Sequence, residues 1–217
     1  MRKIPFVNNE IYHIYNRGVD KRTIFEDRFD LLRFFQSMRE FNTIKPIRSI
    51  FENQFNKEEL TLGCLAPKLV EFIAYSVNPN HYHFALEQQV DGGISEFLKR
   101  LGGGYTNYFN EKYNRNGSLF QGTFKSVHVD SNEYLLHLNS YINLNYKVHQ
   151  YSEEQLQFYK SSWQEYLGNS NYEFCKKDII LSQFKNISEY RKHAESSLDF
   201  IVESRQLIKD YERLLIE

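Results

Sequence analysis

The alternation of hydrophobic and polar positions predicts a small set of strands and helices in the first 150 residues. A period of two indicates strands, which we expect at residues 11–15, 69–77, 81–88 and 118–129. A helical period indicates helices, which we expect at residues 27–42, 94–114 and 131–147. Residues 43–67 contain two prolines and mixed polarity, and we interpret them as a variable insert.

The order of these elements predicts the fold class. Strand, helix, two strands, helix and strand match a ferredoxin-like split β-α-β core, an α+β fold with helices on an antiparallel sheet. The helix at 131–147 is additional to this core. Residues 151–217 form a short connector followed, from residue 186, by amphipathic helices. We therefore expect a domain at 1–150 and a helical C-terminal extension at 151–217.

Three consecutive glycines, Gly102 to Gly104, fall inside the helix predicted at 94–114. Each would cost about 1 kcal/mol relative to alanine in a helix interior. They either kink the helix or let another backbone approach it closely. The alternative interpretation is a loop between two shorter helices.

Charge and cysteine content exclude several classes of protein. The chain has a net charge of −1, from 27 basic and 28 acidic residues, so any nucleic-acid surface must be local. Cys64 and Cys175 are far apart, which argues against a disulfide framework and favours a reducing cytoplasm. No apolar run reaches membrane-spanning length, and no signal-peptide pattern opens the chain.

Two histidines begin the strand predicted at 81–88. Asn78, Pro79 and Asn80 form a turn signal before it. Side chains alternate along a strand, so His81 and His83 share one face and can bind one divalent metal. The pattern alone is weak, because such pairs are often ordinary core or surface histidines. His13 and His128 also lie on predicted strands, where we expect core or surface roles and no metal binding.

The helix predicted at 131–147 carries a second candidate group. Tyr141 and Asn145 are four residues apart, which places them on one helical face. An isolated tyrosine on a helix usually has no catalytic role. Together with a His-aromatic-His strand, however, Tyr141 becomes a candidate nucleophile.

This combination resembles the single-tyrosine HUH transposases, the IS200-like family, and is most similar to the REP-associated tyrosine transposases. The resemblance covers about residues 10–150, and its motifs occur in the family's order. They are YHIYNRG (12–18), NPNHYHFAL (78–86), YTNYFNEKYNRNGSLFQGTFKS (105–126), EYLLHL (133–138) and YINLN (141–145). Two departures are Tyr146, where the family often has proline, and Thr123, where it often has arginine. The second removes a candidate phosphate contact.

The resemblance implies site-specific cleavage and rejoining of single-stranded DNA at hairpin or repeat sequences. His81, His83 and Asn145 match the metal ligands, for Mg²⁺ or Mn²⁺, and Tyr141 matches the catalytic tyrosine. Attack by Tyr141 on phosphorus would give a 5′-phosphotyrosine and a free 3′-hydroxyl. With DNA as substrate, the expected location is the cytoplasm, at the nucleoid.

Basic residues gather locally in the second half of the core. Residues 97–129 carry five basic residues and one acidic residue, a net charge of +4. We predict DNA contacts at Lys125, Arg115, Arg17, Lys99 and Arg100. For Lys99 and Arg100 the alternative is a solvated helix face.

Two other functions remain open. One is a domesticated DNA-hairpin-binding protein that keeps the fold without cutting. The other is a metallohydrolase that uses the histidine pair and does not need Tyr141. The long C-terminal extension favours a monomer over a homodimer.

Overall fold

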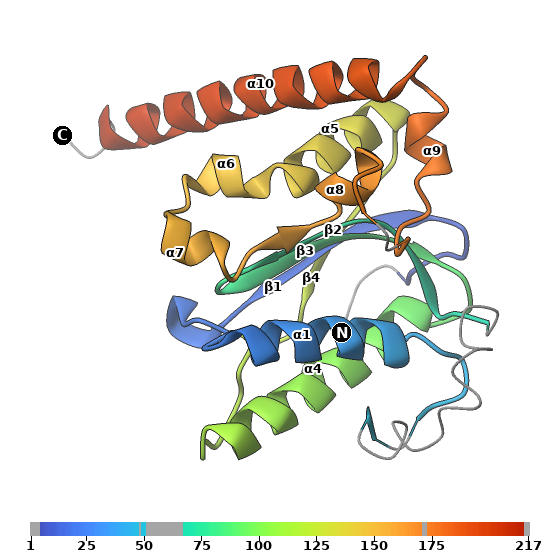
Figure 1. Ribbon diagram of the computed structural model, residues 1–217, viewed down its shortest axis with the longest axis vertical. Coiled ribbons are helices and arrows are strands. Elements are labelled where there is room, and N and C mark those ends of the chain that lie inside the picture. The colour runs from blue at the N-terminus through green and yellow to red at the C-terminus, as the bar shows by residue number, and fades with distance from the viewer. Residues whose placement is uncertain (1–4, 48, 51–66, 171–172, 215–217) are drawn as a thin grey trace.

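The described residues of the computed structural model form a five-stranded sheet between two layers of helices (Figure 1). The structure describes residues 5–47, 49–50, 67–170 and 173–214. Most of the predicted insert at 43–67 lies outside them. The core elements are β1 (Ile11–Arg17), the 3-10 turn η1 (Val19–Lys21), α1 (Arg28–Glu40), β2 (Val70–Asn78), β3 (His81–Gln88), α4 (Gly93–Lys112), β4 (Lys125–His128) and α5 (Asn132–Asn143). They are followed by α6 (Asn145–His149), α7 (Glu153–Leu156), β5 (Lys160–Ser161), α8 (Trp163–Tyr166), α9 (Asp178–Leu181) and α10 (Ile187–Leu214).

The sheet confirms the predicted α+β fold class. Its strand order is β4-β1-β3-β2-β5, and each neighbouring pair is antiparallel. The first four strands have the ferredoxin-like order, which the split β-α-β pattern predicts. In the register of β1 with β3, Tyr15 lies opposite His83 and Arg17 lies opposite His81. The centre of the sheet therefore carries both histidines.

The last core strand is shorter than predicted. Instead of a strand over 118–129, only Lys125–His128 pair with β1. Gly117 and Gly122 have positive φ angles of 88° and 64°, outside the extended conformation of a strand. Residues 118–124 therefore form a loop. It meets the end of β1 through hydrogen bonds between Gln121 and Arg17, and an isolated bridge joins Phe120 to Gly18.

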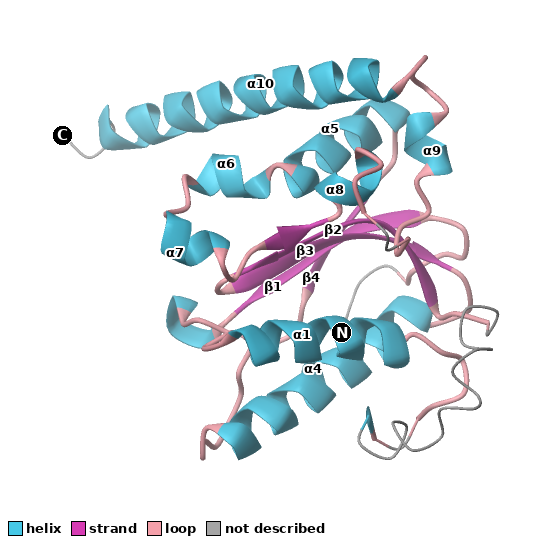
Figure 2. Cartoon of the chain, viewed as in Figure 1, coloured by secondary structure: helices cyan, strands magenta, loops and turns pink. Residues whose placement is uncertain are grey.

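Helices α1 and α4 cover one face of the sheet (Figure 2). Asp27 caps α1, and its side chain and that of Asp30 exchange hydrogen bonds with each other's backbone N–H. The buried side of α1 includes Phe34, whose ring lies 5.9 Å from that of Tyr82 on β3. This contact fixes which face of β3 is core, and it turns the neighbouring histidines to the other face.

Helix α4 runs without interruption through the three glycines. A Cβ atom at Gly104 would lie 2.6 Å from ring atoms of Phe41. At Gly102 and Gly103 it would meet no heavy atom of the described residues within 4 Å. The predicted alternative of a loop between two helices is therefore wrong. Gly104 permits close packing of α4, whereas the other two glycines leave its surface open.

The second helical layer covers the histidine face, and here one predicted helix is divided into two. Instead of a helix over 131–147, α5 ends at Asn143 and α6 begins at Asn145. The Asn143 carbonyl accepts hydrogen bonds from Tyr159 Oη at 3.0 Å and Ser161 Oγ at 2.9 Å. In a continuous helix this carbonyl would accept a hydrogen bond from the backbone N–H four residues later. Here it accepts hydrogen bonds from side chains of the extension instead, which explains the break.

The extension is more than the predicted connector and helices, because β5 joins the sheet beside β2. Helix α10 then packs along α5 (Figure 1). At this contact the buried ring of Tyr190 lies 5.8 Å from Trp163 and 5.2 Å from Tyr166. The amphipathic helical extension is therefore part of the same packed unit as the core.

Candidate active site

The two histidines of β3 lie on one face of the sheet, as the alternation predicts. Their ring centroids are 5.1 Å apart and the rings are nearly perpendicular, at 87°. His83 is buried, with 9% of its surface exposed, and His81 is half-buried. Tyr82 between them is buried on the opposite face. Two imidazoles therefore face the layer that contains α5 and α6.

Each imidazole is engaged through its Nδ1 atom. His81 Nδ1 lies 2.7 Å from Asn80 Oδ1, and His83 Nδ1 lies 2.9 Å from His13 Nε2. Burial lowers the pKa of the His13 imidazole to about 4, so this ring is neutral at neutral pH. Because Nδ1 is engaged in both rings, Nε2 is the nitrogen suited to coordinate a cation.

Tyr141 lies against the histidine pair. It is half-buried in the last turn of α5, and its ring centroid lies 5.3 Å from that of His83 at an interplanar angle of 76°. The same ring lies 6.4 Å from that of His13. The fold thus brings together His81, His83 and Tyr141, which are up to 60 residues apart in sequence.

Asn145 is the first residue of α6, one turn after Tyr141. Its side chain is fully buried, at 0% exposure. Neither its Oδ1 nor its Nδ2 atom has a hydrogen-bond partner within the part of the chain that the structure describes. A buried amide without partners is costly. A cation held by the amide oxygen would satisfy Oδ1, so this residue fits the predicted ligand role.

The sequence prediction missed His149, at the end of α6. This exposed ring lies 4.9 Å from that of His81 and is stacked on Tyr151 at 5.4 Å. Tyr151 Oη donates to Oδ1 of the buried Asn78, at 3.1 Å, and burial raises the pKa of this phenol. The sequence offered only one signal, the spacing of four between Asn145 and His149, and the predicted helix ended before it.

The sheet register separates the five predicted DNA contacts into two groups. Residues directly opposite each other in antiparallel strands share a face. Arg17 lies opposite His81, and Lys125 lies opposite Tyr15, which is itself opposite His83. Arg17 and Lys125 are therefore on the histidine face and beside the site. The remaining three, Lys99, Arg100 and Arg115, belong to α4 or the turn that follows it, on the other face.

Several of these cations also hold the protein's own groups. Arg17 Nε donates to Gln121 Oε1 at 2.7 Å. Arg100 donates to Glu96 and to the Thr43 carbonyl, and its side chain is only 13% exposed. Lys99, in contrast, is 81% exposed. The amount of cationic surface available to a phosphate therefore differs widely among the predicted contacts.

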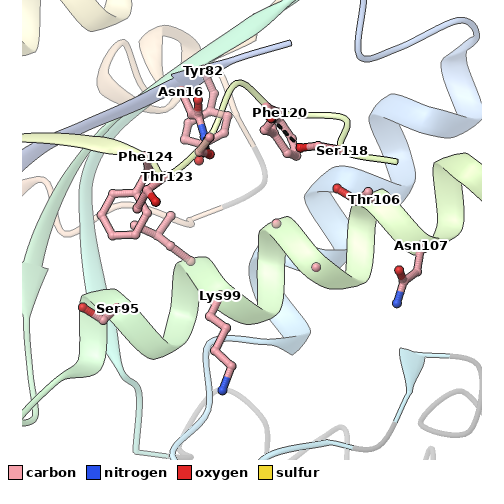
Figure 3. A pocket seen from close by; sticks show the side chains of 14 residues that line it. Asn16, Tyr82, Ser95, Lys99, Thr106, Asn107, Ser118, Phe120, Thr123 and Phe124 are labelled. Carbon is pink, nitrogen blue, oxygen red and sulfur yellow. Dashed lines mark hydrogen bonds between the residues drawn. The ribbon is translucent and has the colours of Figure 1, made fainter. Parts of the chain in front are cut away.

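On the face of the sheet away from the histidines, a groove of about 620 Å³ separates α4 from residues 118–124. Figure 3 shows Lys99, Thr106 and Asn107 along α4, with Phe120 and Phe124 on the facing loop. Gly102 and Gly103 form an open part of its wall. The approach of another backbone at these glycines stays a prediction.

Neither a cluster of typical metal ligands nor a membrane-spanning helix occurs among the described residues. They contain no group of three or more His, Cys, Asp or Glu side chains that could hold a metal ion. A third ligand beside His81 and His83 would have to be of another type, and the Asn145 amide stays the predicted one. Within the same residues, no helix has the length and apolar character needed to cross a membrane.

Comparison with known proteins identifies a family. The family described as "Transposase IS200 like" matches residues 7–145, a segment that contains His81, His83, Tyr141 and Asn145. Among solved structures, the chain is similar to a REP-associated tyrosine transposase bound to a REP hairpin. The two share 14% sequence identity with a TM-score of 0.44, over 80% of this chain and 88% of that one. A search of curated proteins gave no match.

Proposed function

This chain belongs to the family of IS200-like transposases, and from this premise we propose that it cleaves and rejoins single-stranded DNA at hairpin or repeat sequences through Tyr141. The observation that carries the proposal is the position of the Tyr141 ring, 5.3 Å from that of His83. A phenol beside an imidazole pair supplies a nucleophile next to candidate cation ligands, which suits tyrosine-dependent phosphoryl transfer.

His81, His83 and Asn145 would hold a divalent cation, Mg²⁺ or Mn²⁺. When bound, such a cation would supply positive charge that lowers the repulsion between the scissile phosphate and a nucleophile. The unpartnered buried amide of Asn145 supports this ligand set. Asn80 and His13 hold the two imidazoles through their Nδ1 atoms, so the ligands are oriented before a cation arrives.

Tyr141 Oη attacks phosphorus and forms an O–P bond, and its phenolic proton passes to solvent water. The bond from phosphorus to the 3′ oxygen breaks, and that oxygen leaves as a 3′-hydroxyl after protonation. The product is a 5′-phosphotyrosine, which keeps the energy of the original ester. A 3′-hydroxyl can therefore attack the same phosphorus, release Tyr141 and join strands without ATP.

DNA reaches the site along the histidine face. Arg17 and Lys125 lie on this face. Arg17 is on β1, which pairs with the histidine strand β3, and Lys125 is on β4, which pairs with the other side of β1. Their charges favour the phosphates that flank the scissile bond. Lys99, Arg100 and Arg115 belong to a more distant contact with the same substrate. The groove beside Lys99 is the surface on that side.

Residues 1–150 form the catalytic domain in this proposal, and residues 151–217 support it. Hydrogen bonds from Tyr159 and Ser161 to Asn143 tie the tyrosine helix to its own chain. This favours a monomer in which Tyr141 acts on DNA bound by the same chain. Light scattering after size-exclusion chromatography should give a mass near 26.1 kDa, and a stable dimer would contradict the monomer.

With DNA as substrate, the protein acts in the cytoplasm at the nucleoid, and a fluorescent fusion excluded from the nucleoid would argue against this location.

A denaturing gel tests the covalent step. The protein is mixed with single-stranded hairpins from the flanks of its own gene, with Mn²⁺ or Mg²⁺ present. We expect a protein–DNA band that EDTA and Tyr141→Phe both remove. Tyr146→Phe is the matched control, because Tyr146 is equally half-buried but its ring packs on Tyr159. Tyr146→Phe should keep the band.

The same assay separates the two alternatives. A hairpin-specific gel shift without any covalent band would support a domesticated binding protein. A metallohydrolase that uses the histidine pair would cut DNA without a covalent band, and Tyr141→Phe would leave its activity intact. Either result would remove Tyr141 from the proposed mechanism.

A further inference from the structure

We propose that His13 is a positioning residue that holds His83 in the tautomer with hydrogen on Nδ1, so that Nε2 is available for the cation. The inference rests on the proposed function, because it concerns the same metal site. Its starting point is the contact of 2.9 Å between His13 Nε2 and His83 Nδ1. Both residues are buried, each with 9% of its surface exposed.

Only one arrangement of protons in this contact is compatible with metal binding. A neutral imidazole carries hydrogen on one ring nitrogen and a lone pair on the other. If His13 Nε2–H donated to His83, the hydrogen of His83 would be on Nε2 and that atom could not bind a metal. If His83 Nδ1–H donates to His13, the lone pair of His83 is on Nε2. His13 must then accept through Nε2.

The neighbouring ligand is held in the same way by a group whose orientation is fixed. Asn80 Nδ2 donates to the Lys21 carbonyl at 3.0 Å, so Asn80 Oδ1 is the atom directed at His81. An amide oxygen only accepts, so His81 carries its hydrogen on Nδ1. The two ligands then have the same tautomer and both present Nε2. His13, on β1, thus accepts the hydrogen of His83 Nδ1, just as Asn80, in the turn before β3, accepts the hydrogen of His81 Nδ1.

Aromatic packing keeps His13 in place for this role. The Tyr15 ring lies beside both imidazoles, with centroids 5.0 Å from His13 and 5.7 Å from His83. The two imidazoles are nearly parallel, at 25°. Tyr141 stands almost perpendicular to both, at 80° and 76°. His13 thus orients the ligand and also forms part of the surface against which Tyr141 packs.

The first measurement needs no metal. Two-dimensional NMR of protein with ¹⁵N-labelled histidine distinguishes the two tautomers of a neutral imidazole. In metal-free wild type we expect His83 to carry its hydrogen on Nδ1. A His83 with hydrogen on Nε2 would overturn the inference, whatever the variants do.

Two substitutions test whether His13 is the cause. His13→Gln places an amide oxygen where Nε2 was and can still accept, whereas His13→Leu cannot. We expect His13→Leu to lose the Nδ1–H tautomer and to bind Mn²⁺ about 10- to 100-fold more weakly by calorimetry. His13→Gln should stay close to wild type. His128→Leu is the control, because His128 lies on the neighbouring strand β4 and its imidazole contacts Glu10.

The outcomes separate this inference from the proposed function. Unchanged Mn²⁺ affinity and tautomer in a folded His13→Leu would overturn the role of His13 and leave the proposed function standing. If wild type binds no Mn²⁺ but His83 shows the Nδ1–H tautomer and loses it in His13→Leu, the positioning role is supported and the metal mechanism fails. If His13→Leu does not fold, wild type and His13→Gln still decide the question through their tautomers.

Discussion

Ser162 Oγ donates a hydrogen bond to Asn143 Oδ1 over 2.6 Å, although the two residues belong to different parts of the chain. Asn143 ends the helix that carries Tyr141, and Ser162 lies in the C-terminal extension. Asn143 Nδ2 also donates to Tyr190 Oη on α10 at 3.0 Å. All three side chains are buried. The position of the tyrosine helix is therefore set partly by residues that follow it in sequence.

Replacing Asn143 tests this coupling. Asn143→Leu removes one hydrogen-bond partner each of Ser162 and Tyr190 in a buried site, so we expect the free energy of unfolding to fall by about 1–3 kcal/mol. Asn132→Ala is the matched control, since Asn132 also links α5 to the extension, but through exposed bonds to Gln183. That change should cost less than about 0.5 kcal/mol. Urea unfolding measures both, and equal losses would contradict the coupling.

Two neighbouring glycines of α4 should respond to alanine in opposite directions. Gly104→Ala places a methyl group 2.6 Å from the Phe41 ring, and such overpacking costs about 1–3 kcal/mol. Gly103→Ala meets no described atom within 4 Å, so its higher helix propensity should add up to about 1 kcal/mol. Urea unfolding of the pair, at one pH, gives the comparison. A loss at Gly103 as large as that at Gly104 would show that the open wall of the groove is needed for folding.

Local patterns predicted the strand that carries the two candidate metal ligands, and the strand before it. The turn signal and the alternation around His81 and His83 are visible within ten residues, because a strand places every second side chain on one face. The structure has these strands at Val70–Asn78 and His81–Gln88, within a residue of the prediction. The role of His13 could not be found in this way. Its contact with His83 depends on how strands 70 residues apart pair.

The features that the sequence did not predict depend on contacts between distant parts of the chain. The break after Asn143 follows from hydrogen bonds with Tyr159 and Ser161, which no helical period reveals. Strand β5 has only two residues, Lys160 and Ser161, too few to show alternation. Its formation depends on the free edge of β2. The DNA contacts were predicted from local charge, and only the register separates them between two faces.

The salt dependence of DNA binding distinguishes lysines that contact phosphates from lysines that do not contact DNA. Neutralising one lysine that contacts single-stranded DNA should reduce the slope of log K against log salt by about 0.7. We expect this for Lys125→Gln, on the histidine face, and for Lys99→Gln, beside the groove. Lys185→Gln is the control, because this exposed lysine precedes α10 in the extension. Fluorescence anisotropy with a labelled hairpin supplies the slopes. An unchanged slope for either of the first two would remove that residue from the DNA contact.

The packing of α10 on α5 should weaken in acid because of His193. Burial and the neighbouring His137 imidazole, whose ring lies 6.4 Å away, lower the pKa of His193 below its ordinary value of 6.5. The unfolded chain then binds this proton more readily than the folded protein. The stability that this group contributes is therefore complete above pH 6.5 and is lost as the pH falls from 6.5 toward the lower folded pKa.

His193→Gln should flatten the pH dependence of urea unfolding in this range. Lys192→Gln, the adjacent exposed position on the same helix, should not. Identical pH profiles for wild type and His193→Gln would show that this imidazole contributes nothing to the acid sensitivity of the interface.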